Sequence, residues 1–232
     1  MKTGIIGAMA VEVASLKEQM EGAQVTKVAG MEFCDGTLGD ELVVVVQCGI
    51  GKVNAGMCVQ ILADRFGVDR VINTGVAGSL DARLDVGDLV VSADCVMHDF
   101  DVTPLGYEPG QVPGLDTLAF PANEEMVKAV VDAAAVVAPD IKVLPGRVVS
   151  GDQFISTQEQ KDRIRGTFGG LCCEMEGTAI AQAAWLNGLP FVVVRAISDK
   201  PGTTEQVVDY NTFEAKAAQD CARIVKRMVC GA

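Results

Sequence analysis

The sequence is poor in histidine and in positive charge. Its 232 residues include one histidine, His98, and 19 basic residues stand against 31 acidic ones, for a formal net charge of −12. A mixed Cys/His zinc site would have to gather scattered thiols around that single imidazole, so we predict no metal site. A chain of this charge, without a basic run, repels phosphate backbones and anionic lipids. We therefore expect neither nucleic acid nor a membrane as a partner.

Long hydrophobic runs and paired-cysteine motifs are also missing. No apolar stretch approaches the roughly 20 residues of a membrane-spanning helix, and Glu12 interrupts the start of the chain where a signal peptide would have its apolar core. The eight cysteines form no CxxC pair, and several stand inside apolar runs such as residues 171–173. This usage is typical of buried thiols in a reducing compartment, so the sequence predicts a cytoplasmic protein.

Two glycine patterns resemble nucleotide-binding motifs but lack their spacing. Residues 4–7 do not continue into the G-x-G-x-x-G turn of dinucleotide-binding proteins. Gly51-Lys52 resembles the end of a P-loop, yet Val46 and Val53 stand where that motif requires Gly and Ser or Thr. We therefore predict neither a nicotinamide nor an ATP site, and no cofactor.

What the chain does contain is an alternation of short β-branched runs and longer segments with helical periodicity. This alternation predicts a mixed, mostly parallel sheet with helices on both faces, a three-layer α/β/α sandwich. The length suits a single domain over residues 1–232. The predicted strands are residues 4–7, 42–46, 70–73, 88–92, 142–150 and 191–197, and the predicted helices are 11–20, 53–66, 124–138, 158–164, 178–187 and 212–229.

Residues 100–121 interrupt the alternation with four prolines and three glycines. Their apolar residues are scattered and fit neither a strand nor a helix. Loops of this length inside a domain usually carry function. We therefore interpret the segment as a long functional loop.

Charged residues stand where apolar strands end, which is where α/β sheets bind ligands. Glu174 and Glu176 flank Met175 after an apolar run, and Arg195 and Asp199 stand at the end of the last predicted strand. The two glutamates would also be favourable charges at a helix start, and Arg195 and Asp199 would equally fit a structural ion pair. The residues alone leave these alternatives open, although a buried Glu176 suits the adjacent hydroxyls of a ribose.

Six motifs follow one another over nearly the whole chain. They are residues 4–9 with Glu12, 49–55, 73–75 with 77–78, 149–152 with 154–155, 174–176 and 195–199. Their joint order and spacing resemble the 5′-methylthioadenosine/S-adenosylhomocysteine nucleosidases, members of the purine nucleoside phosphorylase superfamily. The resemblance implies a nucleoside phosphorylase-like fold. It also implies hydrolysis of the N-glycosidic bond of 5′-methylthioadenosine, S-adenosylhomocysteine and 5′-deoxyadenosine, in methionine salvage and methyl-cycle recycling.

The same resemblance implies how the reaction would run. Asp199, oriented by Ser198, would protonate N7 of adenine and so improve the leaving group, and burial would help the carboxyl to keep that proton near neutral pH. Glu12, aided by Arg195, would position and deprotonate the attacking water. Glu176 would hold the ribose hydroxyls. No metal or cofactor takes part in this chemistry.

The resemblance also assigns contacts to the substrate, a small nucleoside. Glu174 and Met175 would line the sugar, Phe154 and Phe213 would pack on the base, the Ile155 backbone would read its edge, and Ile50 would help to form an apolar 5′-alkylthio pocket. Members of the family are homodimers with shared active sites, and Tyr107 and Pro113 match the positions that reach the neighbouring site. The full predicted binding set is Ile50, Ala77, Gly78, Tyr107, Pro113, Phe154, Ile155, Glu174, Met175, Glu176, Ser198 and Phe213.

One departure from the family pattern and three rival functions remain. Val76 stands where many family members have Ser, which removes a hydroxyl near the ribose and the water. A phosphorylase would need cationic phosphate ligands, whereas Glu12 would repel the anion. Futalosine or another nucleoside with a different 5′ group remains an alternative substrate. If the acidic residues are only structural, the chain is a non-catalytic nucleoside-binding protein.

Overall fold

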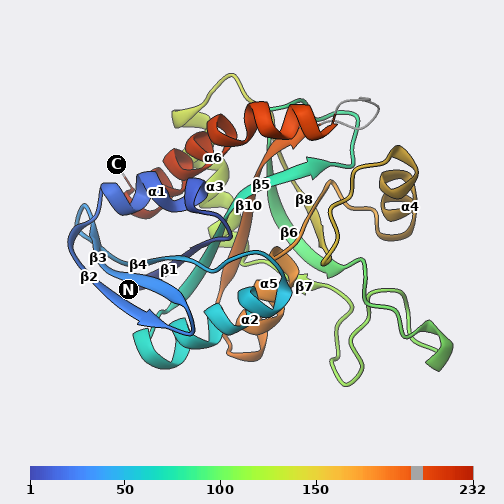
Figure 1. Ribbon diagram of the computed structural model, residues 1–232, viewed down its shortest axis with the longest axis horizontal. Helices are drawn as coiled ribbons and strands as arrows, with labels where there is room; N and C mark the ends of the chain where they lie inside the picture. The colour runs from blue at the N-terminus through green and yellow to red at the C-terminus, as the bar shows by residue number, and fades with distance from the viewer. Residues whose placement is uncertain (200–205, 232) are drawn as a thin grey trace.

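The computed structural model describes the backbone of residues 1–199 and 206–231, and the side chains of residues 1–199 and 215–231. Strands and helices alternate along these residues (Figure 1). The strands are β1 (Lys2–Gly7), β2 (Glu21–Val28), β3 (Met31–Leu38), β4 (Glu41–Gln47), β5 (Arg70–Ser79), β6 (Leu89–Met97), β7 (Phe120–Pro121), β8 (Val143–Ser150), β9 (Cys172–Glu174) and β10 (Phe191–Asp199). The helices are α1 (Ala10–Glu18), α2 (Lys52–Ile61), α3 (Glu124–Val137), α4 (Gln158–Phe168), α5 (Gly177–Leu186) and α6 (Gln206–Cys230), with a π-helical turn at Leu62–Phe66 and a 3-10 turn at Thr103–Leu105.

Every predicted strand and helix overlaps an observed one, but four strands were not predicted. β2 is exposed over nearly its whole length, so no hydrophobic alternation marks it, and it is held by antiparallel pairing with β3. β7 and β9 are only two and three residues long. Apart from β7 and the 3-10 turn, residues 100–121 are irregular, as predicted.

The strands form one mixed sheet in the order β10-β6-β8-β9-β5-β1-β4-β3-β2, with β7 beside β6. β1 runs parallel to β4 and β5, whereas β2, β3 and β4 form an antiparallel edge. β10 pairs with β6 on one side and with β5 on the other. The five strands β5, β9, β8, β6 and β10 therefore close into a ring, and the remaining strands extend from it.

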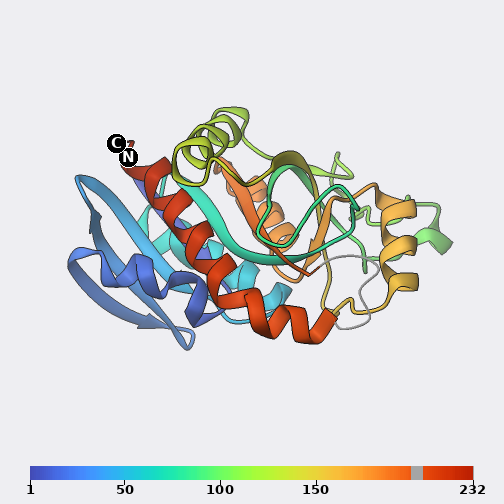
Figure 2. The same cartoon turned by 90° about the horizontal axis from the view of Figure 1, so that it is seen from above.

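Helices cover both faces of the sheet, which confirms the predicted α/β class (Figures 1 and 2). α6 packs on β5 and β10 with α1 and α3 beside it, and α2 and α5 pack together on the opposite face. Val43 and Val45 of β4 belong to the core under α6, whereas Val44 and Val46 belong to the core under α2 and α5. A strand buried on both faces must be apolar at every position, which explains the continuous valine run.

The register of β5 and β10 positions the polar residues that end these strands. The two strands are parallel, and Arg195 lies beside Gly75 and Asp199 beside Gly78. The carboxyl end of β1 reaches the same edge, because β1 pairs in parallel with β5. Within the described residues, no helix has the length and apolar character needed to cross a membrane.

Candidate active site

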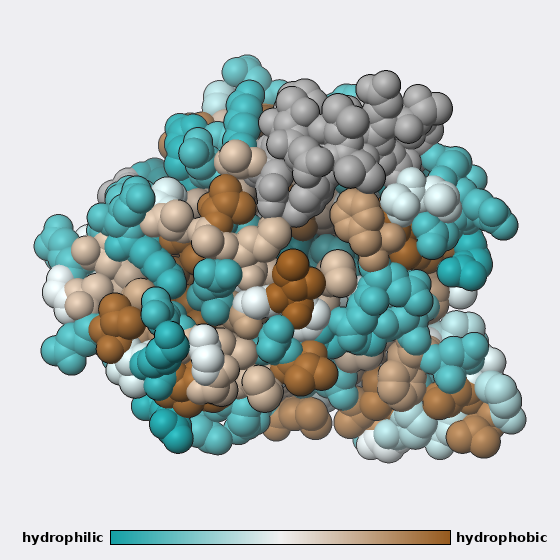
Figure 3. Space-filling model, viewed as in Figure 1, coloured by the Kyte–Doolittle hydropathy of each residue, from teal (hydrophilic) through white to brown (hydrophobic). Residues whose placement is uncertain are grey.

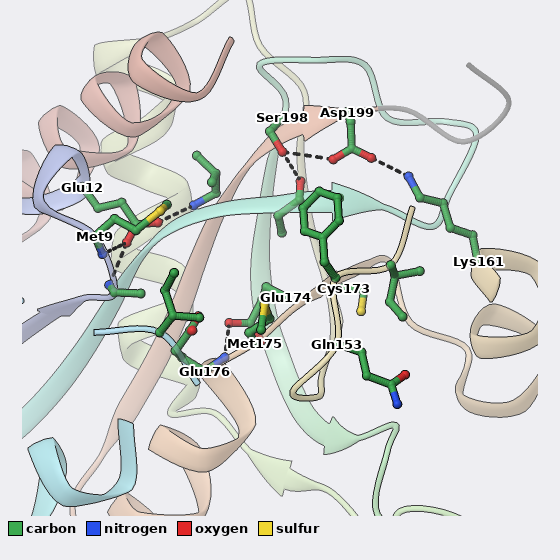
Figure 4. Close-up of a pocket in the computed structure, with 17 residues that line it drawn as sticks. Met9, Glu12, Gln153, Lys161, Cys173, Glu174, Met175, Glu176, Ser198 and Asp199 are labelled. Carbon is green, nitrogen blue, oxygen red and sulfur yellow. Dashed lines mark hydrogen bonds and ion pairs between the residues drawn. The ribbon is translucent and has the colours of Figure 1, made fainter. Parts of the chain in front are cut away.

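A cavity of about 210 Å³ opens where the ends of β1, β5, β9 and β10 meet (Figure 4). It brings together residues from each of the six motifs found in the sequence and, from a seventh segment, Lys161 of α4. The predicted residues that line it are Glu12, Ile50, Ala77, Gly78, Phe154, Ile155, Glu174, Met175, Glu176, Ser198 and Asp199. Six further lining residues were not assigned from the sequence: Ala8, Met9, Val76, Gln153, Lys161 and Cys173.

Arg195, Tyr107 and Pro113 are predicted residues with described side chains that do not line this cavity. Arg195 is buried beside Glu174, at 2% exposure. Tyr107 and Pro113 belong to the loop between β6 and β7, which extends away from the body of the molecule in Figures 1 and 2. Phe213 lies in α6, outside the residues whose side chains are described.

Glu12 is fixed by backbone donors on two sides. Its Oε2 accepts hydrogen bonds from the backbone N–H groups of Ala8 at 2.7 Å and Met9 at 3.0 Å, and its Oε1 accepts from the N–H of Val76 at 3.1 Å. Burial raises the pKa of Glu12, although Arg195 and these N–H groups act in the opposite direction. Glu12 is thus a rigid carboxyl group with increased basicity, which is what a general base requires.

Gly75 allows Glu12 and Arg195 to approach each other. A Cβ at this position would overlap Glu12 Oε1 and come to 3.2 Å from Arg195 Nη1. The glycine therefore leaves room for the carboxylate beside β5, with the guanidinium charge close behind it.

Arg195 forms a buried ion pair with Glu174. Its Nη2 donates to Glu174 Oε2 at 2.5 Å and to the side-chain oxygen of Asn73. Glu174 also accepts from Ser150 Oγ, and from the N–H groups of Glu176 at 3.0 Å and Gly177 at 2.7 Å. Burial alone would raise the pKa of Glu174, but Arg195 and these donors lower it. Glu174 lines the cavity as predicted, yet its oxygens are already occupied.

Glu176 is the less constrained carboxylate of this segment. Its Oε1 accepts one hydrogen bond from the N–H of Gly51 at 2.7 Å. Burial, followed by the negative charge of Glu174, raises its pKa to about 7. Its acceptor capacity is only partly used within the chain, so it suits a ligand that presents hydroxyl donors.

A network outside the cavity holds Gly51 in place. Lys52 Nζ donates to both oxygens of Asp99 at 2.6 and 2.7 Å, and its N–H donates to Asp152 Oδ1 at 2.9 Å. The N–H of Asp152 donates in turn to Asp99 at 2.8 Å. The loops before α2 and after β8 are therefore tied together, which fixes the N–H that Glu176 accepts.

Asp199 lies across the cavity from Glu12 (Figure 4). Ser198 Oγ donates to Asp199 Oδ1 at 3.1 Å. Asp199 Oδ2 accepts from Lys161 Nζ at 2.5 Å, and both side chains are buried. The sequence left open a structural ion pair between Arg195 and Asp199; among the described residues Arg195 pairs instead with Glu174, and Asp199 pairs with Lys161.

Lys161 is the charged lining residue that sequence reasoning missed. It lies in α4, whose sequence is rich in charged and polar residues, so no single lysine stands out there. The available signal was its spacing from Ile164 and Phe168, because residues at i, i+3 and i+7 share one helix face. No cluster of three or more potential metal-ligating side chains occurs among the residues that the structure describes.

Comparison with known proteins places this arrangement in a family. The sequence profile of the phosphorylase superfamily matches residues 2–229. The chain is 44% identical to the 5′-methylthioadenosine/S-adenosylhomocysteine nucleosidase of Geobacillus kaustophilus over 230 residues, which cover 99% of this chain and 97% of the relative. The chain belongs to this nucleosidase family.

Solved structures agree with this assignment. The nucleosidase of Colwellia psychrerythraea, in complex with adenine, has a TM-score of 0.94 at 42% identity and covers 99% of this chain and 95% of its own. The nucleosidase of Neisseria meningitidis, in complex with methylthio-immucillin-A, has a TM-score of 0.94 at 35% identity, covering 100% and 99%. The futalosine hydrolase of Helicobacter pylori also matches, with a TM-score of 0.93 at 30% identity, covering 100% and 98%.

Proposed function

We propose that this nucleosidase-family chain hydrolyses the N-glycosidic bond of 5′-methylthioadenosine and S-adenosylhomocysteine, and releases adenine and the 5-substituted ribose. The observation that carries the proposal is the placement of Glu12, Glu176 and Asp199 around one cavity, each from a different part of the chain (Figure 4). The complexes of relatives with adenine and a methylthio inhibitor support the same ligand class. The reaction belongs to methionine salvage, and residues 1–232 act in it as one domain.

Asp199 acts on the adenine base, and Glu12 acts on the attacking water. Asp199 delivers a proton to N7 of adenine, so the electron pair of the breaking C1′–N9 bond enters a base that leaves without negative charge. Glu12 takes a proton from the water as its oxygen attacks C1′, and the nearby Arg195 charge steadies the carboxyl before and after that transfer. The rigid hydrogen bonds of Glu12 keep this geometry fixed.

Glu176 binds the ribose hydroxyls, for which its ionised form is needed. Met175 and Glu174 line the sugar, Ala77 and Gly78 contact the substrate from β5, and Phe154, Phe213 and the Ile155 backbone hold the base. Ile50 forms part of the apolar 5′ pocket. Support comes from the cavity lining for all of these residues except Phe213, which lies outside the described side chains.

The chain works as a homodimer, with Tyr107 and Pro113 reaching the partner's active site. Exposed apolar side chains support this part of the proposal, because they gather around α2, α5 and the cavity mouth (Figure 3). They include Ile50, Val53, Met57, Phe154, Trp185 and Leu186. Large apolar side chains left exposed near one another are typical of an interface. The eight free cysteines support a reducing, cytoplasmic setting.

Hydrolysis is favoured over phosphorolysis by the charges around the cavity. A phosphate nucleophile needs cationic or backbone N–H ligands on the ribose side. On that side the charged residues that line the cavity, among those described, are the acids Glu12, Glu174 and Glu176. The guanidinium of Arg195 is already paired with Glu174. Lys161, the lining cation, is paired with Asp199 on the other side of the cavity.

Release of the purine base from 5′-methylthioadenosine, S-adenosylhomocysteine, 5′-deoxyadenosine and inosine, each with and without phosphate, tests the proposal; the base is adenine for the first three and hypoxanthine for inosine. We expect phosphate-independent release from the first three. A futalosine reaction run in parallel measures how tolerant the 5′ pocket is. Release that requires phosphate would make the chain a phosphorylase, and tight adenosine binding without turnover would make it a binding protein.

A further inference from the structure

Lys161 is a buried lysine on a helix that is otherwise largely exposed. Its side chain is 1% exposed, it lines the cavity, and its Nζ lies 2.5 Å from Asp199 Oδ2. Only Lys161 and Ile164 are buried among the residues of α4. One ammonium group of this helix is therefore buried, and it contacts Asp199, the carboxyl group that acts as the acid in the proposed reaction.

The position of α4 explains how the ammonium reaches Asp199. The helix follows directly on the loop that carries Phe154 and Ile155, and Thr157 caps its first turn by accepting a hydrogen bond from the N–H of Gln160 at 3.2 Å. Lys161 stands one turn after this cap. The segment proposed to face the adenine base therefore also carries Lys161, whose ammonium group contacts Asp199 Oδ2.

The pair poses a chemical problem that stability does not explain. A buried ion pair contributes little net stability, because desolvation of the two charges offsets their attraction. An acid must also receive a proton before it can give one away, and the ammonium group of Lys161 contacts Asp199 Oδ2 directly, at 2.5 Å. The geometry thus offers a proton donor on one side of Asp199 and the cavity on the other.

We propose that Lys161 is a positioning residue that fixes Asp199 beside the leaving base and supplies, through it, the proton that N7 receives. The inference rests on the proposed function. As the C1′–N9 bond breaks, one proton moves from the Lys161 ammonium to the Asp199 carboxylate and from Asp199 to N7, which leaves Lys161 as the neutral amine and Asp199 as the carboxylate. Water adds at C1′, its proton goes to Glu12 and then to solvent, and the Lys161 amine recovers a proton from solvent after the base has left.

The described groups around the pair do not replace Lys161 as a proton source. Ser198 donates to Asp199 from β10, and the Cys173 thiol faces the pair from β9. Burial raises the pKa of Cys173, so this thiol stays neutral. Glu174 and Glu176 lie further along the cavity (Figure 4). Glu174 carries a negative charge, and Glu176 binds the sugar in the proposed reaction.

The test compares two leaving groups in Lys161→Met. One substrate is 5′-methylthioadenosine, whose base needs a proton, and the other is a 4-nitrophenyl riboside, whose phenolate leaves without one. We expect kcat for the nucleoside at pH 7.5 to fall about 100-fold, within the usual range for acid–base catalysis, and kcat for the aryl riboside to stay within about twofold of the parent.

Lys128→Met is the matched control. Lys128 also pairs with an aspartate at 2.5 Å, Asp132, but that pair is exposed on α3. This variant should behave as the parent with both substrates. A double-mutant cycle with Asp199→Asn completes the test, since a residue that acts through Asp199 has no further effect once that carboxyl is gone.

The outcomes separate this inference from the proposed function. If the parent chain releases no adenine, the proposed function fails and the inference fails with it. If the parent is active but Lys161→Met keeps its rate with the nucleoside, or loses activity toward both substrates equally, only the inference is overturned. The same holds if Lys161→Met reduces activity as strongly in the Asp199→Asn background as in the parent.

Discussion

Glu174 and Glu176 are two residues apart, yet their pKa values are shifted in opposite directions. The charge and the hydrogen bond of Arg195, with hydrogen bonds from Ser150 and the N–H of Glu176, lower the pKa of Glu174 despite its burial. Glu176 is buried beside that negative charge and accepts one hydrogen bond from the N–H of Gly51, and its pKa rises to about 7. One carboxylate thus anchors the site and the other stays available to a ligand.

Glu176→Gln should show this difference in the pH dependence of stability. The folded state raises the pKa of Glu176 from the ordinary value of 4.5 to about 7, so this group favours folding below pH 4.5 and loses that contribution as the pH rises to about 7. The unfolding free energy of the ligand-free parent should therefore fall relative to Glu176→Gln between these values. Urea unfolding at pH 5 and pH 8 measures it, and parallel pH curves for the two proteins would contradict the assignment.

The same variant should bind ribose poorly. Loss of a charged acceptor for the hydroxyls should lower kcat/KM for 5′-methylthioadenosine by about 10- to 100-fold. Steady-state kinetics at pH 8, where the parent's Glu176 is mostly ionised, checks this loss. An unchanged kcat/KM would show that the ribose is held elsewhere.

Gly75→Ala should misplace Glu12 without unfolding the protein. The added Cβ overlaps Glu12 Oε1, so the carboxyl must leave its three N–H donors. A displacement of this size should reduce kcat about 100-fold. Gly56→Ala is the control, because a Cβ there meets nothing within 4 Å and helix α2 should be slightly stabilised. Equal activity of the two variants would exclude Glu12 as the base.

At the scale of elements, the site depends on short contacts between the ends of strands and helices. Ser150 ends β8, donates to Glu174 at the end of β9, and accepts from the N–H of Thr178 in α5 at 2.7 Å. This one hydroxyl therefore connects three elements and supports the Glu174–Arg195 pair from behind.

Ser150→Ala should lower the unfolding free energy by about 1–3 kcal/mol, because it leaves a buried N–H and one carboxylate oxygen without a partner. Chemical denaturation measures the loss. Ser156→Ala, whose hydroxyl lies outside this network, should change stability much less. If the two substitutions lower the unfolding free energy equally, Ser150 has no special role in holding the three elements together.

At the scale of the whole molecule, the proposed dimer uses the face that carries α2 and α5. Val53 of α2 is 74% exposed and Val136 of α3, on the opposite face of the sheet, is 62% exposed. The sequence alone does not distinguish these two valines. Their positions in the fold do, because only Val53 lies near the cavity mouth and its neighbouring apolar side chains.

Val53→Glu should therefore dissociate the dimer, whereas Val136→Glu should leave it intact. A charge placed in an apolar interface is desolvated without a partner. Sedimentation measures the mass of each variant, and dilution of Val53→Glu should lower its specific activity if sites are shared. A monomeric parent, or a Val53→Glu variant that is still dimeric, would contradict the proposed interface.

The α/β class could be predicted from sequence because it depends on local patterns, whereas the candidate site residues came from the ordered motifs that resemble the nucleosidases. Buried strands such as β4 and β10 are apolar at every position, and the acids Glu12, Glu176 and Asp199 belong to motifs with fixed spacing. β2 escaped prediction because exposed residues carry no hydrophobic alternation, and only its pairing with β3 makes it a strand. The ring closed by β10 is likewise a matter of long-range pairing.

The sequence by itself determined which residue types meet at the strand ends, and tertiary structure alone decided which charges pair. Arg195 and Asp199 are four residues apart, but their partners are Glu174, 21 residues from Arg195, and Lys161, 38 residues from Asp199. Distances through space and burial decide which charged groups pair, and the spacing of residues along the sequence predicts neither. For this reason the difference between Glu174 and Glu176, and the contact of Lys161 with Asp199, emerge only when β9, β10 and α4 are packed together.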